Sequence, residues 1–252
     1  MNLHYRKFGK GEPIVILHGL FGTSDNWQTV GKILSNNFQI FLVDLRNHGH
    51  SPHSDVMDYY AMSEDLFALF NNEKINNAII IGHSMGAKVA MFFTQEHREF
   101  VHKLVVVDMG IKKYAPHHQI IFDALFAVDL NKIHSRKEAE MVIRSFFNDE
   151  SVIQFLLKNL YWQTENQLAW RMNLPVLYRE IDHILAPVPN KIVTVNTLFI
   201  RGGKSNYIVD DDWSEILTVF PNAVLKTIEK AGHWVHAEAF NEFLQILNDF
   251  IN

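Results

Sequence analysis

The chain has 252 residues, of which 48% are hydrophobic, and it carries a formal net charge of −5 with no cysteine. This length fits one large α/β domain or a domain with an insertion, and the acidic balance argues against a nucleic-acid-binding protein, since neutralising phosphates requires a basic face. The missing cysteines exclude disulfides and thiolate metal sites, and without a secretory core or an apolar run of bilayer length we expect a cytoplasmic protein with no membrane span.

Strand-like and helix-like segments alternate over the first hundred residues. The strand-like runs lack polar alternation, as expected of strands buried on both faces, and they cover residues 14–17, 39–43, 78–81 and 103–107. The helical patterns cover residues 24–34, 63–70 and 87–97. Residues 3–7 precede a glycine turn and predict an antiparallel edge strand. This order predicts an α/β fold with a mostly parallel, doubly wound sheet.

The pattern changes after Gly110. Helical spacing dominates with little strand signal, over residues 119–128, 136–147 and 152–160. Alternation then resumes with strands at 197–200 and 223–228 and helices at 213–219 and 238–250. We therefore predict a core of residues 1–110 and 192–252. Residues 111–191 would form a helical cap over the carboxyl ends of the strands, where ligands bind in such sheets. The alternative is an unrelated helical subdomain at the sheet edge.

A G-x-S-x-G motif lies between the strand at 78–81 and the helix at 87–97, as Gly82-His83-Ser84-Met85-Gly86. At such a junction the motif is typical of a nucleophile elbow, a sharp turn that lifts a serine hydroxyl above the sheet. The alternative is a serine that caps the helix N-terminus. The strand-turn-helix context favours Ser84 as a nucleophile.

A serine nucleophile needs a base that removes its proton, and in this fold the base follows the serine and the acid along the chain. His233 lies in a loop between the last strand and the final helix, which places it at the carboxyl edge of the sheet. We expect His236 to begin the final helix and His83 to pack under the elbow. His233 is therefore the predicted base.

The acid is less obvious, because the loop at residues 201–207 holds Asn206 and no carboxylate. Asp108 follows three valines at the end of the strand next to that of Ser84, and a desolvated acid there calls for a specific partner. The run Asp210 to Asp212 is the alternative, although these acids fit the first turn of a helix. Asp108 is the preferred candidate.

Stabilising an oxyanion requires two preorganised N–H donors. Met85, directly after the nucleophile, supplies one, and the loop after the strand at 14–17 supplies the other, with Leu20 preferred and Phe21 next. The polar loop at 44–51 is interpreted as bracing, since its two histidines have no third ligand at zinc-like spacing.

With these motifs in place, the chain resembles the α/β-hydrolase superfamily over essentially its whole length, and more closely the YbfF-type bacterial esterases. The resemblance rests on residues 18–22, 44–51, 82–86, 199–207 and 232–238. It implies an esterase or thioesterase with a Ser-His-Asp triad under a helical cap and no cofactor. It also implies an acid after the strand that follows the nucleophile, which matches Asp108. Asn47 stands where many relatives have glycine, and the missing acid near Asn206 departs from the wider superfamily but not from this branch.

The function predicted is a serine hydrolase that cleaves carboxylic esters or thioesters through an acyl-enzyme on Ser84. The resemblance implies small acyl esters or acyl-CoA as substrates. A C–C bond hydrolase or related lyase could use the same triad, and a non-enzymatic ligand-binding relative is the other alternative. Five aromatic residues of the cap offer apolar surface, and most are expected to pack inward while a few line an acyl pocket: Phe122, Phe126, Phe155, Tyr161 and Trp162.

Overall fold

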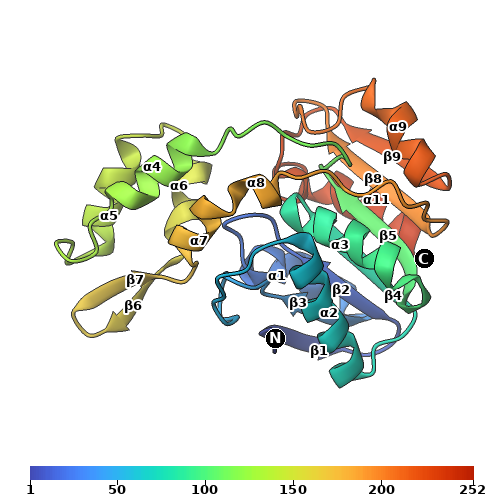
Figure 1. Cartoon of the computed structure of the whole chain (residues 1–252), viewed down its shortest axis with the longest axis horizontal. Helices are drawn as coiled ribbons and strands as arrows, with labels where there is room; N and C mark the ends of the chain where they lie inside the picture. Colours follow the sequence, from blue (N-terminus) through green and yellow to red (C-terminus); the bar gives the residue numbers. More distant parts are fainter.

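A computed structural model describes all 252 residues and is built around one seven-stranded sheet. The strand order is β1-β3-β2-β4-β5-β8-β9, and only β1 runs antiparallel, as an edge strand on β3 (Figure 1). The strands are β1 (Tyr5–Gly9), β2 (Pro13–Leu17), β3 (Gln39–Val43), β4 (Ala78–His83), β5 (Val101–Val107), β8 (Asn196–Gly202) and β9 (Ala223–Ile228). The α/β-hydrolase fold predicted from the sequence is confirmed, with β4 at the middle of the sheet.

Helices cover both faces of the sheet, because successive strand residues point to opposite sides. Ile14 and Ile16 of β2 join one apolar cluster, while Val15 and Leu17 join the other. On the first face lie η1 (Ser24–Trp27), α1 (Gln28–Leu34), α10 (Val235–Glu238) and α11 (Phe240–Ile251). On the second face lie α2 (Tyr59–Glu73), α3 (Met85–Glu96) and α9 (Asp212–Val219), and the short turn η2 (Arg98–Phe100) follows α3.

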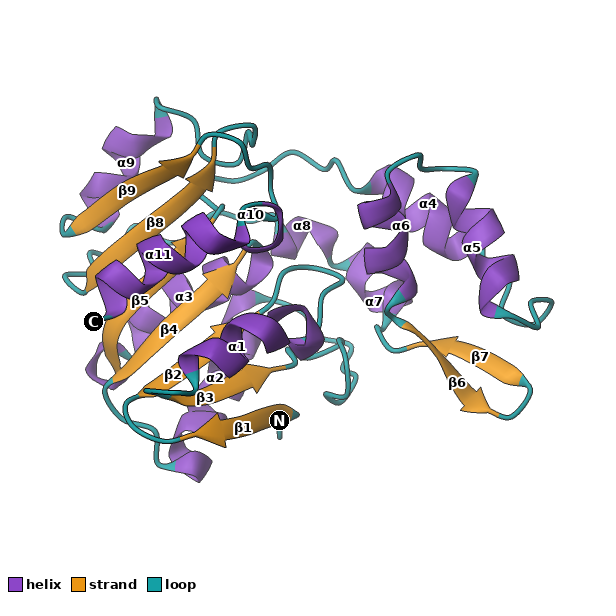
Figure 2. Ribbon diagram, turned by 180° about the vertical axis from the view of Figure 1, so that it is seen from behind, coloured by secondary structure: helices purple, strands orange, loops and turns teal.

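The segment between β5 and β8 forms a separate group of elements, here termed the insert. It comprises α4 (Gln119–Ala127), α5 (Arg136–Arg144), α6 (Glu150–Leu157), α7 (Leu174–Arg179), α8 (Ile181–Ile184) and a hairpin of β6 (Leu160–Thr164) with β7 (Gln167–Trp170). Figure 2 shows the hairpin and α4 to α7 standing beyond one end of the sheet, with α8 leading back to it. The hairpin was not predicted. Its strands are partly exposed, with Trp162 46% accessible, so they produce no continuous apolar run.

A buried side chain of α3 bonds to both chain connections of the insert. Lys88 of α3 donates from Nζ to the carbonyl oxygens of Lys112 (2.9 Å), Leu185 (3.4 Å) and Ala186. Lys112 lies just before α4, and Leu185 and Ala186 directly follow α8. Burial without a carboxylate partner lowers the pKa of Lys88 to about 7. A single amine therefore holds both chain connections of the insert.

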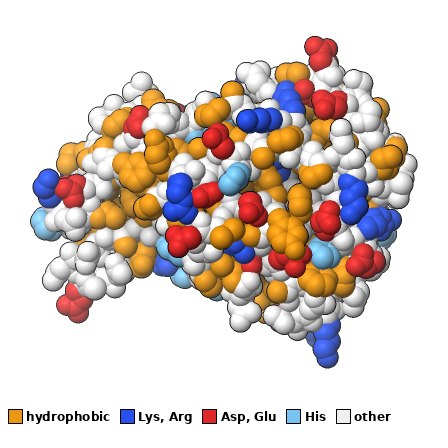
Figure 3. All heavy atoms as spheres, viewed as in Figure 1, with side chains coloured by type: hydrophobic (Ala, Val, Ile, Leu, Met, Phe, Trp, Pro, Cys, Tyr) orange, Lys and Arg blue, Asp and Glu red, His pale blue; other side chains and the backbone are white.

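The surface carries mixed charges. On the face shown in Figure 3, acidic and basic side chains are interspersed, and hydrophobic side chains gather over the insert at the left. Ile120, Phe126 and Tyr178 are exposed apolar residues of this region, with the Phe126 and Tyr178 ring centroids 5.5 Å apart. None of the helices combines the length and the hydropathy needed to cross a bilayer.

Candidate active site

Ser84 occupies a strained turn between β4 and α3. Its backbone has φ +53° and ψ −121°, a left-handed conformation that non-glycine residues rarely adopt outside functional sites. The turn needs both flanking glycines. A Cβ on Gly82 would lie 2.4 Å from the carbonyl oxygen of Gly86, and one on Gly86 would lie 2.4 Å from that of His18. The sequence therefore places Ser84 at the carboxyl end of the middle strand, where its side chain borders a cavity.

Asp108 and His233 are brought together beside Ser84, although they lie 125 positions apart in the chain. The His233 Nδ1 is 2.7 Å from Asp108 Oδ2. The same carboxyl group accepts from the Ser205 hydroxyl at 2.5 Å and from the Gly202 N–H at 2.9 Å. Asp108 is fully buried, so three donors surround a carboxylate that water cannot reach. This arrangement fixes the tautomer of His233 with Nδ1 protonated and leaves Nε2 as an acceptor.

The alternative acids lie elsewhere. Asp210 pairs with Arg201 at 2.6 Å, and Asp212 pairs with Lys112 at 2.6 Å. Asp211 precedes the first residue of α9 as its N-cap. None of the three bonds to His233, so the geometry favours Asp108.

Two further side chains hold His233 in place, and the sequence analysis had given neither of them this role. The ring of Tyr207 stacks on the imidazole, with centroids 4.0 Å apart and planes 20° apart. His83 Nε2 lies 2.9 Å from the His233 carbonyl oxygen and donates to it. Burial lowers the pKa of His83 well below 6.5, which keeps this ring neutral. Ser205 and Tyr207 both belong to the loop at 201–207, so the polar and aromatic side chains of that loop are the signal in the sequence for these two roles.

His236 is unsuited to act as the base. It was expected to begin the final helix but lies in the short helix α10 that precedes α11, where it stacks on Trp27 with ring centroids 4.2 Å apart and planes 11° apart. Burial lowers its pKa to about 3. Nothing aligns its ring with a carboxylate, in contrast to His233.

The backbone N–H groups of Leu20 and Met85 donate no hydrogen bond within the protein. Met85 is the first residue of α3, so its N–H has no partner in the helix. The other candidate, Phe21, differs because its N–H donates to His48 Nε2 at 3.2 Å. Burial lowers the pKa of His48 to about 3, so its ring is neutral and can accept this bond. The geometry therefore distinguishes Leu20 from Phe21.

A buried carboxylate braces the neighbouring loops. Asp44 accepts from the backbone N–H groups of Ser24 (2.6 Å) and His50 (3.0 Å) and contacts His4 Nδ1 at 2.9 Å. These bonds tie the loop after β3 to the turn that carries Leu20. No metal is needed to explain the two histidines of this loop.

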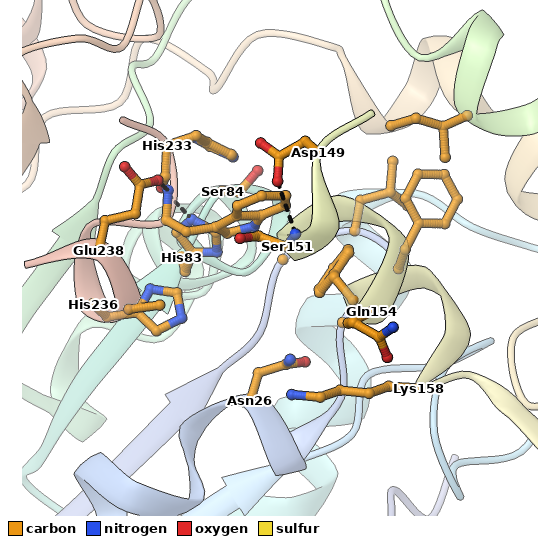
Figure 4. Close-up of a pocket in the computed structure, with 18 of the residues that line it drawn as sticks. Asn26, His83, Ser84, Asp149, Ser151, Gln154, Lys158, His233, His236 and Glu238 are labelled. Atoms are coloured by element: carbon orange, nitrogen blue, oxygen red, sulfur yellow. Dashed lines mark hydrogen bonds between the residues drawn. The ribbon is translucent and has the colours of Figure 1, made fainter. Parts of the chain in front are cut away.

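Ser84 and His233 open onto a cavity of about 750 Å³ between the sheet and α6. In Figure 4 the side chains of Asn26, Gln154 and Lys158 lie together at the end of the cavity away from Ser84. A few of the five cap aromatics were expected to line a pocket, and of these residues only Phe155 borders this space. Phe122 packs against Phe21 with centroids 5.3 Å apart, and Phe126 and Trp162 are exposed.

Polar and charged groups supply much of the cavity wall. Asp149 caps α6 by accepting from the Ser151 N–H at 2.8 Å. Glu238 accepts from two backbone N–H groups of the loop that carries His233, at 2.7 and 3.1 Å. Lys158 has no ion-pair partner and faces the cavity. Both acids are thus occupied locally, and the lysine is free to meet a ligand.

Comparisons with known proteins identify related esterases. Residues 12–240 match the family described as alpha/beta hydrolase fold. Esterase YbfF of Escherichia coli is 38% identical over 241 residues, covering 95% of this chain and 93% of that protein. The sn-1-specific diacylglycerol lipase ABHD11 of Xenopus laevis is 36% identical and covers 96% of this chain and 80% of its own. A solved structure entitled "Marine microorganism esterase" has a TM-score of 0.97, 38% identity and 99% coverage of both chains.

Proposed function

The chain belongs to the α/β-hydrolase family, and from this premise we propose that it is a serine esterase with Ser84, His233 and Asp108 as its catalytic triad. One observation carries the proposal above all others. The imidazole of His233 is bonded through Nδ1 to a fully buried carboxylate, in a cavity that it shares with a serine held at positive φ. A serine hydroxyl becomes a competent nucleophile when a base in this state removes its proton.

In acylation the triad and the two N–H donors act in sequence on the ester carbonyl. As Ser84 Oγ attacks the carbonyl carbon of the ester, its proton passes to His233 Nε2, and Asp108 stabilises the resulting imidazolium. The N–H groups of Leu20 and Met85 donate to the developing oxyanion. The bond from the carbonyl carbon to the alcohol oxygen then breaks, and His233 gives its proton to the departing alcohol.

Deacylation repeats the cycle with water. His233 removes a proton from a water molecule that attacks the acyl carbon, and the same two N–H groups stabilise the second oxyanion. The bond to Ser84 Oγ breaks, Oγ takes the proton back, and a carboxylic acid leaves.

The substrates proposed are carboxylic esters of small molecules, with acyl-CoA thioesters as a narrower possibility that uses the same steps. The names of the relatives support the ester class, since one is an esterase and another a diacylglycerol lipase. The helical cap at residues 111–191 and the cytoplasmic location remain predictions.

The experiment that tests this proposal compares Ser84→Ala with the wild type on p-nitrophenyl acetate. We expect kcat to fall by several orders of magnitude, on the scale of triad knockouts. Ser63→Ala is the matched control, because Ser63 is buried in α2 and its hydroxyl has no hydrogen-bond partner. Hydrolysis at an undiminished rate by Ser84→Ala would overturn the proposal.

A further inference from the structure

Two cavities meet at Ser84, and they differ greatly in size. The larger one, of about 750 Å³, has apolar and polar parts, and the side chains of Asn26, Gln154 and Lys158 belong to its polar part. The smaller one leaves only about 10 Å³ for a water-sized group and is lined mainly by apolar side chains. Its lining includes Leu20, Met85, Met109, Ile184 and Leu185. Space of that size holds about one heavy atom with its hydrogens, the size of a water or a methyl group.

His233 determines which half of an ester each cavity receives. The departing alcohol must lie next to His233 because it takes its proton from that ring. His233 borders the larger cavity and does not border the smaller one. Met85, one of the two oxyanion donors, borders the smaller cavity and not the larger.

We infer that the smaller cavity is the acyl subsite and the larger cavity is the leaving-group subsite, so the enzyme favours acetyl-sized acyl groups on large, polar alcohols. This inference rests on the proposed function. A tetrahedral carbon on Ser84 Oγ has three other substituents. With the oxyanion at the N–H groups of Leu20 and Met85 and the alcohol toward His233, the acyl chain is left to meet the other apolar side chains of the smaller cavity, Met109, Ile184 and Leu185.

The wall of the acyl subsite is held firmly. Ile184 is the last residue of α8 and Leu185 follows it, and the Tyr59 hydroxyl donates to the Ile184 carbonyl oxygen. The Leu185 carbonyl oxygen accepts from Lys88, and its N–H donates to the carbonyl of Ile181 at 2.9 Å. Because these bonds fix the backbone, a longer acyl chain has to displace packed side chains, which is unfavourable in a close-packed interior.

The far end of the leaving-group subsite favours hydrogen-bond acceptors or negative charge on the alcohol. Lys158 is unpaired there, and it lies beside the amide side chains of Gln154 and Asn26 (Figure 4). Lys158 is an exposed side chain, so its ammonium group attracts an anion or a polar acceptor through an interaction that salt screens. The acyl subsite thus selects on the size of the acyl group, and the leaving-group subsite selects on the polarity and charge of the alcohol.

The test is a crossed panel of esters. With p-nitrophenol constant, we expect kcat/KM to fall at least roughly tenfold from acetyl to butyryl and further to octanoyl, the scale on which a closed pocket discriminates added methylenes. With acetyl constant, esters of glycerol 3-phosphate should react faster than those of glycerol. A preference for octanoyl over acetyl would overturn the assignment.

Two variants locate the effect. Met109→Ala should raise the ratio of butyryl to acetyl turnover roughly tenfold, and Ile184→Val should raise it in the same direction if Met109→Ala does not fold. Lys158→Met, the matched change in the other subsite, should leave that ratio unchanged and reduce the preference for glycerol 3-phosphate. The assignment is wrong if Met109→Ala alters alcohol preference instead. Failure of the triad itself would show differently, as full activity in Ser84→Ala.

Discussion

Replacing Asp108 by asparagine removes one charge from the site and almost no volume. The wild-type carboxylate accepts three hydrogen bonds, from Gly202 on Oδ1 and from Ser205 and His233 on Oδ2. An amide has one accepting oxygen and one donating nitrogen. If the amide oxygen stays on Gly202, the NH₂ group faces His233 Nδ1, and the ring then places its proton on Nε2. The reverse orientation sets two donors, the NH₂ and the Gly202 N–H, against each other.

The first orientation is expected, because an unsatisfied buried N–H costs about 1–3 kcal/mol. Its consequence is a histidine in the wrong tautomer, which cannot accept the proton of Ser84. In serine proteases the same change lowers kcat by about 10⁴, which corresponds to about 5 kcal/mol of transition-state stabilisation. We expect a loss of this order for Asp108→Asn with the fold retained.

The assay is kcat on an acetyl ester together with a thermal melt. Asp212→Asn is the control, since Asp212 pairs with Lys112 and not with His233, and its kcat should stay within a few-fold of the wild type. The reasoning is refuted if folded Asp108→Asn keeps more than about a tenth of the activity. It is equally refuted if Asp212→Asn shows the large loss.

Two further predictions concern buried groups around the site. His83→Phe removes the donor to the His233 carbonyl and should lower kcat roughly 10- to 100-fold at unchanged KM. His83→Gln can still donate this bond and should recover part of the lost kcat. Equal kcat in the wild type and both variants would disprove this positioning role. Folding lowers the pKa of Lys88 from its ordinary 10.5 to about 7, so between these pH values the unfolded chain binds the proton that the folded chain lacks, and stability increases as pH rises. Denaturant titrations from pH 7 to 9 should show this slope in the wild type and a smaller one in Lys88→Met, and identical slopes would contradict it.

The core of the fold could be predicted because its strands are buried on both faces. Runs such as residues 14–17 and 40–43 are continuously apolar, and turn signals bound them. The hairpin of β6 and β7 could not be predicted in this way, since its residues are partly exposed and its register depends on packing. Which of the cap aromatics line the cavity could not be predicted for a related reason, because the orientation of each helix of the insert decides which of its faces meets the cavity.

In the candidate site, too, some residues could be predicted from the sequence and others could not. Ser84 and Asp108 directly follow β4 and β5, and His233 lies in the loop after β9. Parallel strands end at one edge of a sheet, so the proximity of the three residues could be anticipated from the chain. The partners that hold them could not. The bond from His83 to the His233 carbonyl joins residues 150 positions apart, and Lys88 bonds to segments 24 and 98 positions away. No local pattern marks such contacts.

The measurement that tests the central claim most directly is covalent capture of the nucleophile. The protein is treated with a fluorophosphonate, and the modified residue is identified by peptide mass mapping. We predict a single adduct on Ser84, formed in the wild type, much more slowly in Asp108→Asn and not at all in Ser84→Ala. An adduct on another residue, or continued ester hydrolysis by protein that is fully modified at Ser84, would contradict it.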